Sequence, residues 1–298
     1  MNKGSIKILL MVISLFFLSS PAFADNIKGI YLTSTTMEDG TYLNYLIRRA
    51  KTAGINTFVI DIDQPSKIYR EHVALLKQNG IRYVARVVIF PQGGTPERIK
   101  SIPYREKKFE LVKTAMEYGA DEIQLDYIRY NTSLGSSSQH AIDVHNVIRW
   151  FKEKLNGVPL QIDVFGITSF GPEDHIGQNV RLFAKDVNVI CPMDYPSHFQ
   201  PFAFHSARPY DTILKALTAL KSQFDDKVPV QIITWIETSN YHYAFTSHAK
   251  QKYIAEQLRA VRDAHVQGWY AWSPSNLYDN LFTVLEGSGS VNTAENKH

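Results

Sequence analysis

The chain repeats one pattern of hydrophobic and polar positions along most of its length. In each repeat, an amphipathic segment with helical periodicity ends at a glycine, and a short run rich in β-branched and aromatic residues follows. Glycine can adopt the left-handed conformation that ends a helix without the cost that a Cβ adds. The clearest repeats predict a helix and then a strand at 42–53 and 56–63, 67–79 and 81–90, 105–118 and 122–130, and 141–156 and 159–166.

The remaining segments follow the same order less regularly. A first strand is expected at 27–34, and the later helix and strand pairs are expected at 178–185 and 187–195, 210–224 and 228–237, and 248–266 and 268–274. Strands that alternate with helices usually pair in parallel. Eight such strands in a chain of this length favour a closed barrel over an open sheet. We therefore predict an α/β protein with a single (β/α)8 TIM barrel at 25–286 and a disordered polar tail at 287–298.

The N-terminal segment has a composition of its own. A short basic stretch with Lys3 and Lys7 precedes an apolar run at 8–18 and a small-x-small site that ends at Ala24. This is the layout of a cleaved signal peptide, and the run is shorter than the ~20 residues of a membrane-spanning helix. We expect a signal peptide at 1–24 and an exported chain, periplasmic or secreted, that keeps no membrane insertion after cleavage.

Composition limits the partners and cofactors that the chain is expected to bind. The net charge is +3 without a basic block, so nucleic acid is not an expected partner. Cys191 is the single cysteine, so no internal disulfide can form. His140 and His145 lie on an expected helix at a spacing that does not place them on one face. No metal and no other cofactor is expected.

Several strands carry polar residues where a barrel interior would be apolar. Gln124 and Asp126 alternate with apolar residues on one strand, and Gln161 and Asp163 repeat this pattern on the next. Catalytic groups in this fold lie at the C-terminal ends of strands, where the loops form an open mouth. We therefore expect Asp126 and Asp163 to lie side by side there. The same alternation places further side chains at the mouth, namely Asp61, Asp63, Arg86, Asp194, Trp235 and Glu237.

Such a cluster of acids has a structural explanation and a chemical one. A single carboxylate at a strand end can pair with Arg86 or Arg129, or cap the next helix. The acids outnumber these cations, however, and two carboxylates that face a cleft suit glycoside hydrolysis. Aromatic residues near strand ends could stack on sugar rings, and these are Tyr31, Tyr127, Tyr195, Trp235 and Trp272. For Tyr31 and Tyr127, filling the core is the simpler interpretation.

Six segments of the chain resemble, in order, the signatures of a bacterial family assigned as glycoside hydrolases. The segments run from Lys28 to Asn276 and read KGIYLTS, NTFVIDID, DEIQLDYIRY, IDVFG, CPMDYPSHF and GWYAWSPSN. This family was first catalogued as a domain of unknown function and is related to the α-amylase-like barrels. The resemblance implies a TIM barrel, a sugar substrate and functional roles for Asp126, Arg129, Asp163, Tyr195, His198, Trp272 and Asn276.

The chain departs from the family pattern at three positions near the expected mouth. Asp63-Gln64 stands where Lys-Asp is usual, Asp194 replaces an apolar residue, and Glu237 replaces a glutamine. The last two changes add acids to the mouth. The identity of the acid catalyst therefore stays open among Asp163, Asp194 and Glu237.

Together these observations predict an exported (β/α)8-barrel glycoside hydrolase that acts on a polysaccharide or oligosaccharide. Asp126 is expected to be the nucleophile or the carboxylate that stabilises the transition state, kept ionised by Arg86 and Arg129. Asp163 is the first candidate for the general acid/base. Sugar hydroxyls and rings would contact Asp61, Arg86, Arg129, Tyr195, His198, Trp235, Trp272 and Asn276. Two alternatives stay open, a barrel that binds glycan without cleaving it and a metal-dependent polysaccharide deacetylase.

Overall fold

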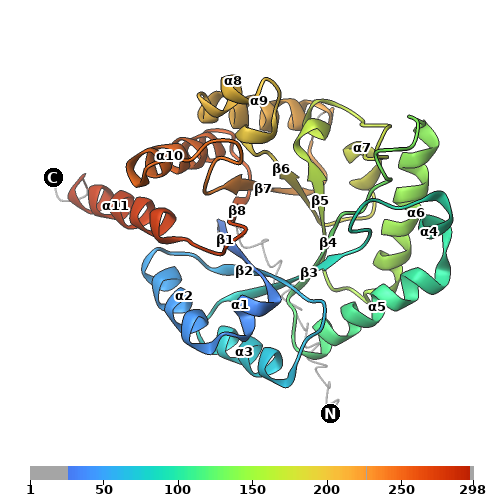
Figure 1. Cartoon of the computed structure of the whole chain (residues 1–298), viewed down its shortest axis with the longest axis horizontal. Helices are drawn as coiled ribbons and strands as arrows, with labels where there is room; N and C mark the ends of the chain where they lie inside the picture. Colours follow the sequence, from blue (N-terminus) through green and yellow to red (C-terminus); the bar gives the residue numbers. More distant parts are fainter. Residues whose placement is uncertain (1–25, 226, 296–298) are drawn as a thin grey trace, which may run out of the picture.

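Eight short parallel strands pair in chain order, and the last strand returns to pair with the first. The computed structural model describes residues 26–225 and 227–295, and Figure 1 looks into the resulting closed barrel, which a ring of helices surrounds. The strands are β1 (Ile27–Leu32), β2 (Thr57–Asp61), β3 (Arg82–Val88), β4 (Glu122–Asp126), β5 (Leu160–Phe165), β6 (Val189–Met193), β7 (Gln231–Glu237) and β8 (Gly268–Trp272). The predicted (β/α)8 TIM barrel is confirmed.

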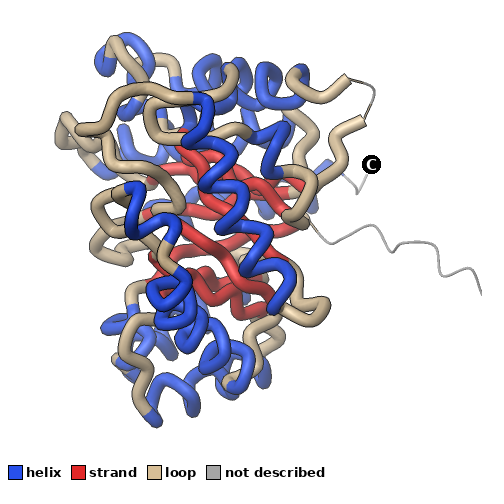
Figure 2. The backbone as a smooth tube through the Cα atoms, turned by 90° about the vertical axis from the view of Figure 1, so that its right-hand side faces the viewer, coloured by secondary structure: helices blue, strands red, loops and turns tan. Residues whose placement is uncertain are grey.

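The helices cover the outer surface of the barrel, as the side view in Figure 2 shows. The expected helices correspond to α2 (Gly40–Thr52), α3 (Lys67–Gln78), α5 (Ile102–Glu117), α6 (Ser138–Lys154), α7 (Val180–Phe183), α9 (Pro209–Ser222) and α10 (Ser247–Asp263). A last helix, α11 (Asp279–Glu295), contacts α2 and closes the ring (Figure 1). It extends into the segment 287–298, where a polar tail was expected. The segment 1–24, interpreted as a signal peptide, lies outside the described residues.

Short helical elements that the periodicity did not predict follow several strands. They are α1 (Ser34–Glu38), α4 (Pro96–Lys100), the 3-10 helices η1 (Gly166–Phe170) and η2 (Pro196–His198), and α8 (Phe202–Ser206). All of them lie in loops that leave the C-terminal ends of strands. They therefore add structure at the face of the barrel where the mouth is expected.

The strand expected at 122–130 is shorter than the sequence pattern indicated. It ends at Asp126 because Tyr127 has a φ angle of 52°. This left-handed conformation is uncommon for a residue with a Cβ and cannot continue an extended strand. The break turns the chain directly after Asp126, so the carboxylate stands at the end of β4.

Two groups of buried apolar residues stabilise the barrel. The larger group lies between the strands and the surrounding helices, and the smaller group lies in the interior that the strands enclose. At the N-terminal end, polar side chains close the interior. The amide of Gln161 donates hydrogen bonds to Glu122 at 2.7 Å and to the Tyr270 hydroxyl at 3.1 Å, and Arg82 pairs with Glu122 at 2.7 Å. Gly29 gives the Tyr270 ring its space, since a Cβ there would lie 2.5 Å from that ring. We call Arg82, Glu122, Gln161 and Tyr270 the barrel plug.

Within residues 26–225 and 227–295, no helix combines the length and the apolar character that crossing a membrane requires.

Candidate active site

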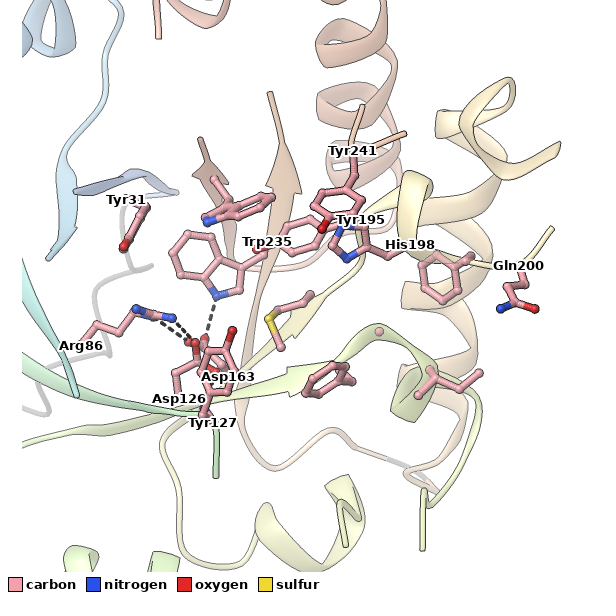
Figure 3. A pocket seen from close by; sticks show the side chains of 16 residues that line it. Tyr31, Arg86, Asp126, Tyr127, Asp163, Tyr195, His198, Gln200, Trp235 and Tyr241 are labelled. Carbon is pink, nitrogen blue, oxygen red and sulfur yellow. Dashed lines mark hydrogen bonds and ion pairs between the residues drawn. The ribbon is translucent and has the colours of Figure 1, made fainter. Parts of the chain in front are cut away.

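A cavity of about 700 Å³ opens at the C-terminal ends of the strands. Most of its wall is apolar or aromatic, and its charged groups gather on one side, where β3, β4 and β5 end (Figure 3). The lining residues are Tyr31, Arg86, Asp126, Tyr127, Asp163, Phe165, Gly166, Ile167, Met193, Tyr195, His198, Phe199, Gln200, Trp235, Tyr241 and Trp272. The structure thus brings Asp126 and Asp163 together, as the sequence pattern predicted.

Arg86 is the centre of the charged group. Its two terminal nitrogens bind different carboxylates, Nη1 that of Asp61 and Nη2 that of Asp126. Nε lies 3.7 Å from Oδ2 of Asp163, which is beyond hydrogen-bond distance. Burial by itself would lower the pKa of Arg86, but Asp126, Asp61 and Asp163 outweigh it and raise that pKa. The guanidinium therefore stays charged among three carboxyl groups.

Of the three carboxyl groups around Arg86, that of Asp163 lies farthest from the guanidinium nitrogens. Its side chain is 1% exposed, and Oδ1 accepts a hydrogen bond from the indole N–H of Trp235 at 2.6 Å. Burial raises the pKa of Asp163 well above its ordinary range, and the nearby Asp126 raises it further. Arg86 and Trp235 oppose this shift without cancelling it. The surroundings of Asp163 thus favour its protonated form.

Asp126 has the opposite surroundings. Besides its ion pair with Arg86, it accepts a hydrogen bond from the backbone N–H of Tyr127 through Oδ1. The left-handed φ of Tyr127 accompanies this contact and places the tyrosine in the wall of the cavity. Strained backbone of this kind is often kept where a functional group must be held in position. Asp126 is therefore a carboxylate held in a fixed position by Arg86 and the backbone, next to Asp163.

Asp61 completes the charged group on the side of β2. It binds Arg86 and accepts a hydrogen bond from the Tyr31 hydroxyl at 2.6 Å. Burial and the neighbouring Asp61 raise the pKa of Tyr31, so the phenol stays protonated. Asp61 is not among the residues that line the cavity, whereas Tyr31 is. Asp61 thus helps to orient both Arg86 and the Tyr31 phenol from the side of β2.

The opposite side of the cavity is aromatic. Tyr195 and Trp272 stack with ring centroids 5.2 Å apart, and the ring of His198 meets both at steep angles. Burial lowers the pKa of His198, and His242 lowers it further, so this imidazole is neutral at neutral pH. All three residues were expected to contact sugar, and all three line the cavity. Figure 3 shows Tyr195 and His198 side by side in this wall.

The expectation that Asp194 faces the mouth is wrong. On β6 the inward positions are Cys191 and Met193, so Asp194, one position further, points outward. Its carboxylate is fully buried and accepts hydrogen bonds from the hydroxyls of Ser169 and Thr234. Burial raises its pKa to about 7. This acid connects β6 to η1 and β7 behind the wall of the cavity.

Glu237 also lies behind the wall, although it stands at the end of β7 as expected. It is fully buried, and both carboxylate oxygens are occupied. Oε1 accepts from the backbone N–H of Ser197 at 2.8 Å and from the Tyr253 hydroxyl, and Oε2 accepts from the Ser197 hydroxyl at 2.7 Å. Burial raises its pKa to about 7. Glu237 fixes η2, which carries His198, against α10.

Arg129 and Asn276 take positions that differ from the expected ones. Nη1 of Arg129 donates to the carbonyl of Tyr130, and within the part of the chain that the structure describes the ion pair of Asp126 is with Arg86 and not with Arg129. Asn276 has a φ of 54° and is buried, and its side chain binds the backbone of Tyr31 and Thr33. It thereby joins the end of β8 to the end of β1 and does not line the cavity.

Part of the cavity wall was not predicted from the sequence. These residues are Phe165, Gly166, Ile167, Met193, Phe199, Gln200 and Tyr241, and Tyr31 and Tyr127, interpreted as core residues, also line it. Most of them lie in loops, where strand alternation gives no direction. Two signals were available. Met193 follows the inward alternation of β6, and Tyr241 lies in the aromatic run Asn240-Tyr241-His242-Tyr243.

No group of three or more His, Cys, Asp or Glu side chains within residues 26–225 and 227–295 is arranged to hold a metal ion. The carboxylates that do gather around Arg86 are bound to its guanidinium.

Solved structures share this fold at low sequence identity. One is the "C-terminal domain of putative chitinase" from Desulfitobacterium hafniense, at 13% identity and a TM-score of 0.61, covering 88% of this chain and 99% of that one. The spore cortex-lytic enzyme SleL of Bacillus megaterium matches at 10% identity and a TM-score of 0.61, covering 90% of this chain and 75% of that one. The endo-beta-1,4-mannanase of Thermotoga petrophila matches at 9% identity and a TM-score of 0.60, covering 89% of this chain and 76% of that one. These likenesses show a common barrel.

The sequence itself identifies a family. No curated protein matches it. Residues 100–278, more than half of the chain, match the family described as "Putative glycosyl hydrolase domain". The matched segment contains β4 to β8 and with them Asp126, Asp163 and the aromatic wall. The chain therefore belongs to this family of glycoside hydrolases.

Proposed function

We propose that the protein hydrolyses O-glycosidic bonds, with Asp163 as the general acid and Asp126 as the carboxylate that acts on the anomeric carbon. The observation that carries this proposal is the unequal sharing of Arg86. Asp126 forms an ion pair with it, whereas Asp163 is buried, lies 3.7 Å from Nε and has a raised pKa. Two nearby carboxyl groups with different protonation states are what glycoside hydrolysis requires.

In this mechanism, Asp163 gives its proton to the glycosidic oxygen as the bond to the anomeric carbon breaks. The Asp126 carboxylate stabilises the positive charge that develops on that carbon, or attacks it to form a glycosyl ester. Water then supplies the hydroxyl group of the new reducing end, and its proton returns to Asp163. Arg86 holds Asp126 in place throughout.

The substrate in this proposal is a carbohydrate that lies against the aromatic wall. Tyr195, His198 and Trp272 offer ring faces and edges, and Trp235 orients Asp163 from below. The C–H face of a sugar carries partial positive charge and is attracted to the negative face of an aromatic ring. Chitinase, mannanase and cortex-lytic barrels of the same fold make polymeric glycans the first substrates to test.

An exported location, periplasmic or secreted, belongs to the same proposal. It rests on the basic, apolar and small-x-small layout of residues 1–24. Sequencing the N-terminus of the protein recovered from the periplasm or the medium tests it, and an intact Met1 on a cytoplasmic protein would contradict it.

The test of the hydrolase proposal is the release of reducing ends from chitin, mannan and peptidoglycan by the wild-type chain and two variants. Asp126→Asn and Asp163→Asn keep the shape of each side chain and remove its acid function. Each should lower the rate at least about a thousandfold. Asp194→Asn is the matched control, since that acid lies behind the wall. Binding without cleavage by the wild type would instead favour a glycan-binding barrel.

The role of Asp126 can be resolved further with a substrate that has a good leaving group. A glycosyl ester on Asp126 would add the mass of the sugar to the peptide that contains it. Trapping that ester by mass spectrometry identifies a nucleophile. Inversion of the anomeric centre without an ester identifies Asp126 as a general base, which then takes the proton of water in place of Asp163.

A further inference from the structure

A series of aromatic rings continues from the cavity wall to the outer surface. His198 lies 5.1 Å from Tyr195 inside the cavity and 5.2 Å from Tyr241 at its rim, measured between ring centroids. Beyond the rim, Tyr241 lies 5.2 Å from His242, and His242 stacks on Phe202 at 4.2 Å. We call His198, Tyr241, His242 and Phe202 the aromatic track. Figure 3 shows its inner end, where Tyr195, His198 and Tyr241 lie together.

The outer part of the track is open to solvent. Tyr241 is 70% exposed, and the neighbouring Tyr243 is 49% exposed. Large aromatic side chains that gather at the surface often mark a binding site, because burial in the core would otherwise stabilise them. Tyr241 lines the cavity that holds Asp126 and Asp163, so the exposed patch continues an existing site.

The exposed rings are held in place by the backbone that carries them. The N–H of Tyr241 donates to the hydroxyl oxygen of Ser197 at 3.1 Å, and Ser197 is itself bound to the buried Glu237. The Asn240 side chain accepts from the N–H groups of His242 and Tyr243, both at 2.8 Å. A surface whose rings are already ordered loses little conformational entropy when it binds a ligand.

We propose that the aromatic track binds the part of a glycan chain that extends out of the cavity, so that the substrate is a polymer or a long oligosaccharide. This inference rests on the proposed glycoside hydrolase function and names its substrate class. A glycan fits the track because the C–H faces of its sugars can contact the exposed faces and edges of aromatic rings. Neighbouring ring centroids in the track lie 4.2–5.2 Å apart, and its inner end adjoins the cavity at Tyr241.

The test compares ligands of different length in the inactive Asp126→Asn background. The probes are β-1,4-linked oligomers of N-acetylglucosamine and of mannose, from the disaccharide to the hexasaccharide, with affinity measured by calorimetry. We expect affinity to rise with length in at least one series. Adding Tyr241→Ala should lower hexasaccharide affinity about fivefold to tenfold, the value of one aromatic contact, and change disaccharide affinity less than twofold. Tyr241→Phe keeps the ring, so its hexasaccharide affinity should equal that of the Asp126→Asn background.

The control is Ile142→Ala, which removes another exposed apolar side chain, 47% exposed, on α6 and outside the track. It should leave every affinity unchanged. Three results would overturn the proposed role of the track. They are equal affinity for oligomers of all lengths, an equal loss of affinity at all lengths in Tyr241→Ala, and no binding of either hexasaccharide. Thermal melting of each variant shows that the fold is intact.

The hydrolase proposal is tested separately by reducing-end release from the same hexasaccharides by the wild-type chain. If the hexasaccharides are cleaved but affinity does not rise with length, the hydrolase proposal stands and the aromatic track does not bind glycan. If affinity rises with length but nothing is cleaved, the track binds glycan and the hydrolase proposal is wrong.

Discussion

The indole N–H of Trp235 donates a hydrogen bond to Oδ1 of Asp163 across 2.6 Å, at the floor of the cavity. The bond joins β7 to β5 through the barrel interior. It favours the ionised form of Asp163 and so lowers its pKa, against the larger upward effects of burial and of Asp126. Trp235 therefore adjusts the protonation of the proposed general acid as well as filling the barrel.

Replacing this donor should move the pH profile in a defined direction. Trp235→Phe keeps an aromatic ring and removes the N–H, so the pKa of Asp163 should rise further. A general acid acts in its protonated form, so the basic limb of kcat/KM, where Asp163 loses its proton, should shift to higher pH. The measurement is kcat/KM against pH on one substrate. A basic limb that stays in place or moves to lower pH would remove Asp163 as the acid.

Arg86 should be required for stability and for activity. Arg86→Met leaves Asp61 and Asp126 without their shared cation in a buried cluster, which should cost about 3–5 kcal/mol of unfolding free energy and abolish turnover. Arg86→Lys keeps the charge, but an ammonium cannot reproduce the two-sided geometry of the guanidinium. It should fold better than Arg86→Met and remain poorly active. Urea unfolding and reducing-end assays measure both effects.

Arg129→Met is the control for this arginine, because Arg129 donates to a carbonyl and stands next to aromatic rings. Its effect on activity should be much smaller than that of Arg86→Met. If instead Arg129→Met were inactive and Arg86→Met active, the assignment of Arg86 as the partner of Asp126 would be wrong.

Asp194 should make the fold less stable as the pH rises. Its pKa is about 7 in the folded chain, against an ordinary value of 3.8. Between these values the unfolded chain has released the proton that the folded chain still holds, so the free energy of unfolding falls with increasing pH. The total effect is at most about 4 kcal/mol, at ~1.4 kcal/mol for each pH unit. Above about pH 7 this group adds no further slope.

The measurement is the urea midpoint between pH 5 and pH 8 for the wild type and Asp194→Asn. An amide fits between the hydroxyls of Ser169 and Thr234, each of which can accept or donate. The variant should therefore show a shallower decline than the wild type. Glu237, whose pKa is also about 7, should account for much of the slope that remains. Equal slopes in both proteins would mean that Asp194 is already ionised in the fold.

The charge of the cavity should exclude acidic sugars. Its lining contains the Asp126 carboxylate, and the guanidinium of Arg86 is already bound to Asp126 and Asp61. Among the described residues that line it, no further Lys or Arg is available to a uronate or a phosphate. Oligosaccharides of glucuronic or galacturonic acid should bind at least about tenfold more weakly than neutral chains of the same length. Tighter binding of the uronates would contradict this distribution of charge.

Strand alternation was enough to predict the barrel and half of the site. Asp126, Asp163 and Arg86 were correctly expected at the mouth, because each lies at an inward position of a regular strand. Asp194 was placed wrongly by the same reasoning, since a shift of one residue reverses the direction of a side chain. The inward set of β6 contains Cys191 and Met193, which look like ordinary core residues in the sequence.

The other half of the site depends on loops, where no period gives direction. The burial of Glu237 follows from Ser197 and Tyr253, which are distant in sequence and meet it only in the fold. The same holds for Tyr241, whose exposure next to the cavity depends on how the loop after β7 lies against η2. The left-handed Tyr127, which ends β4, also has no sequence signal of the kind that glycine provides.

The barrel plug gives the cavity a single entrance. Arg82, Glu122, Gln161 and Tyr270 fill the N-terminal end, so no glycan can pass through the barrel. Substrate and products must use the same opening, and a product that remains bound blocks the next encounter. Turnover on a long chain would then be governed by how quickly the cleaved end withdraws past Tyr241 and the other rings at the rim. An enzyme of this shape should be inhibited by its own products, and more strongly by longer ones.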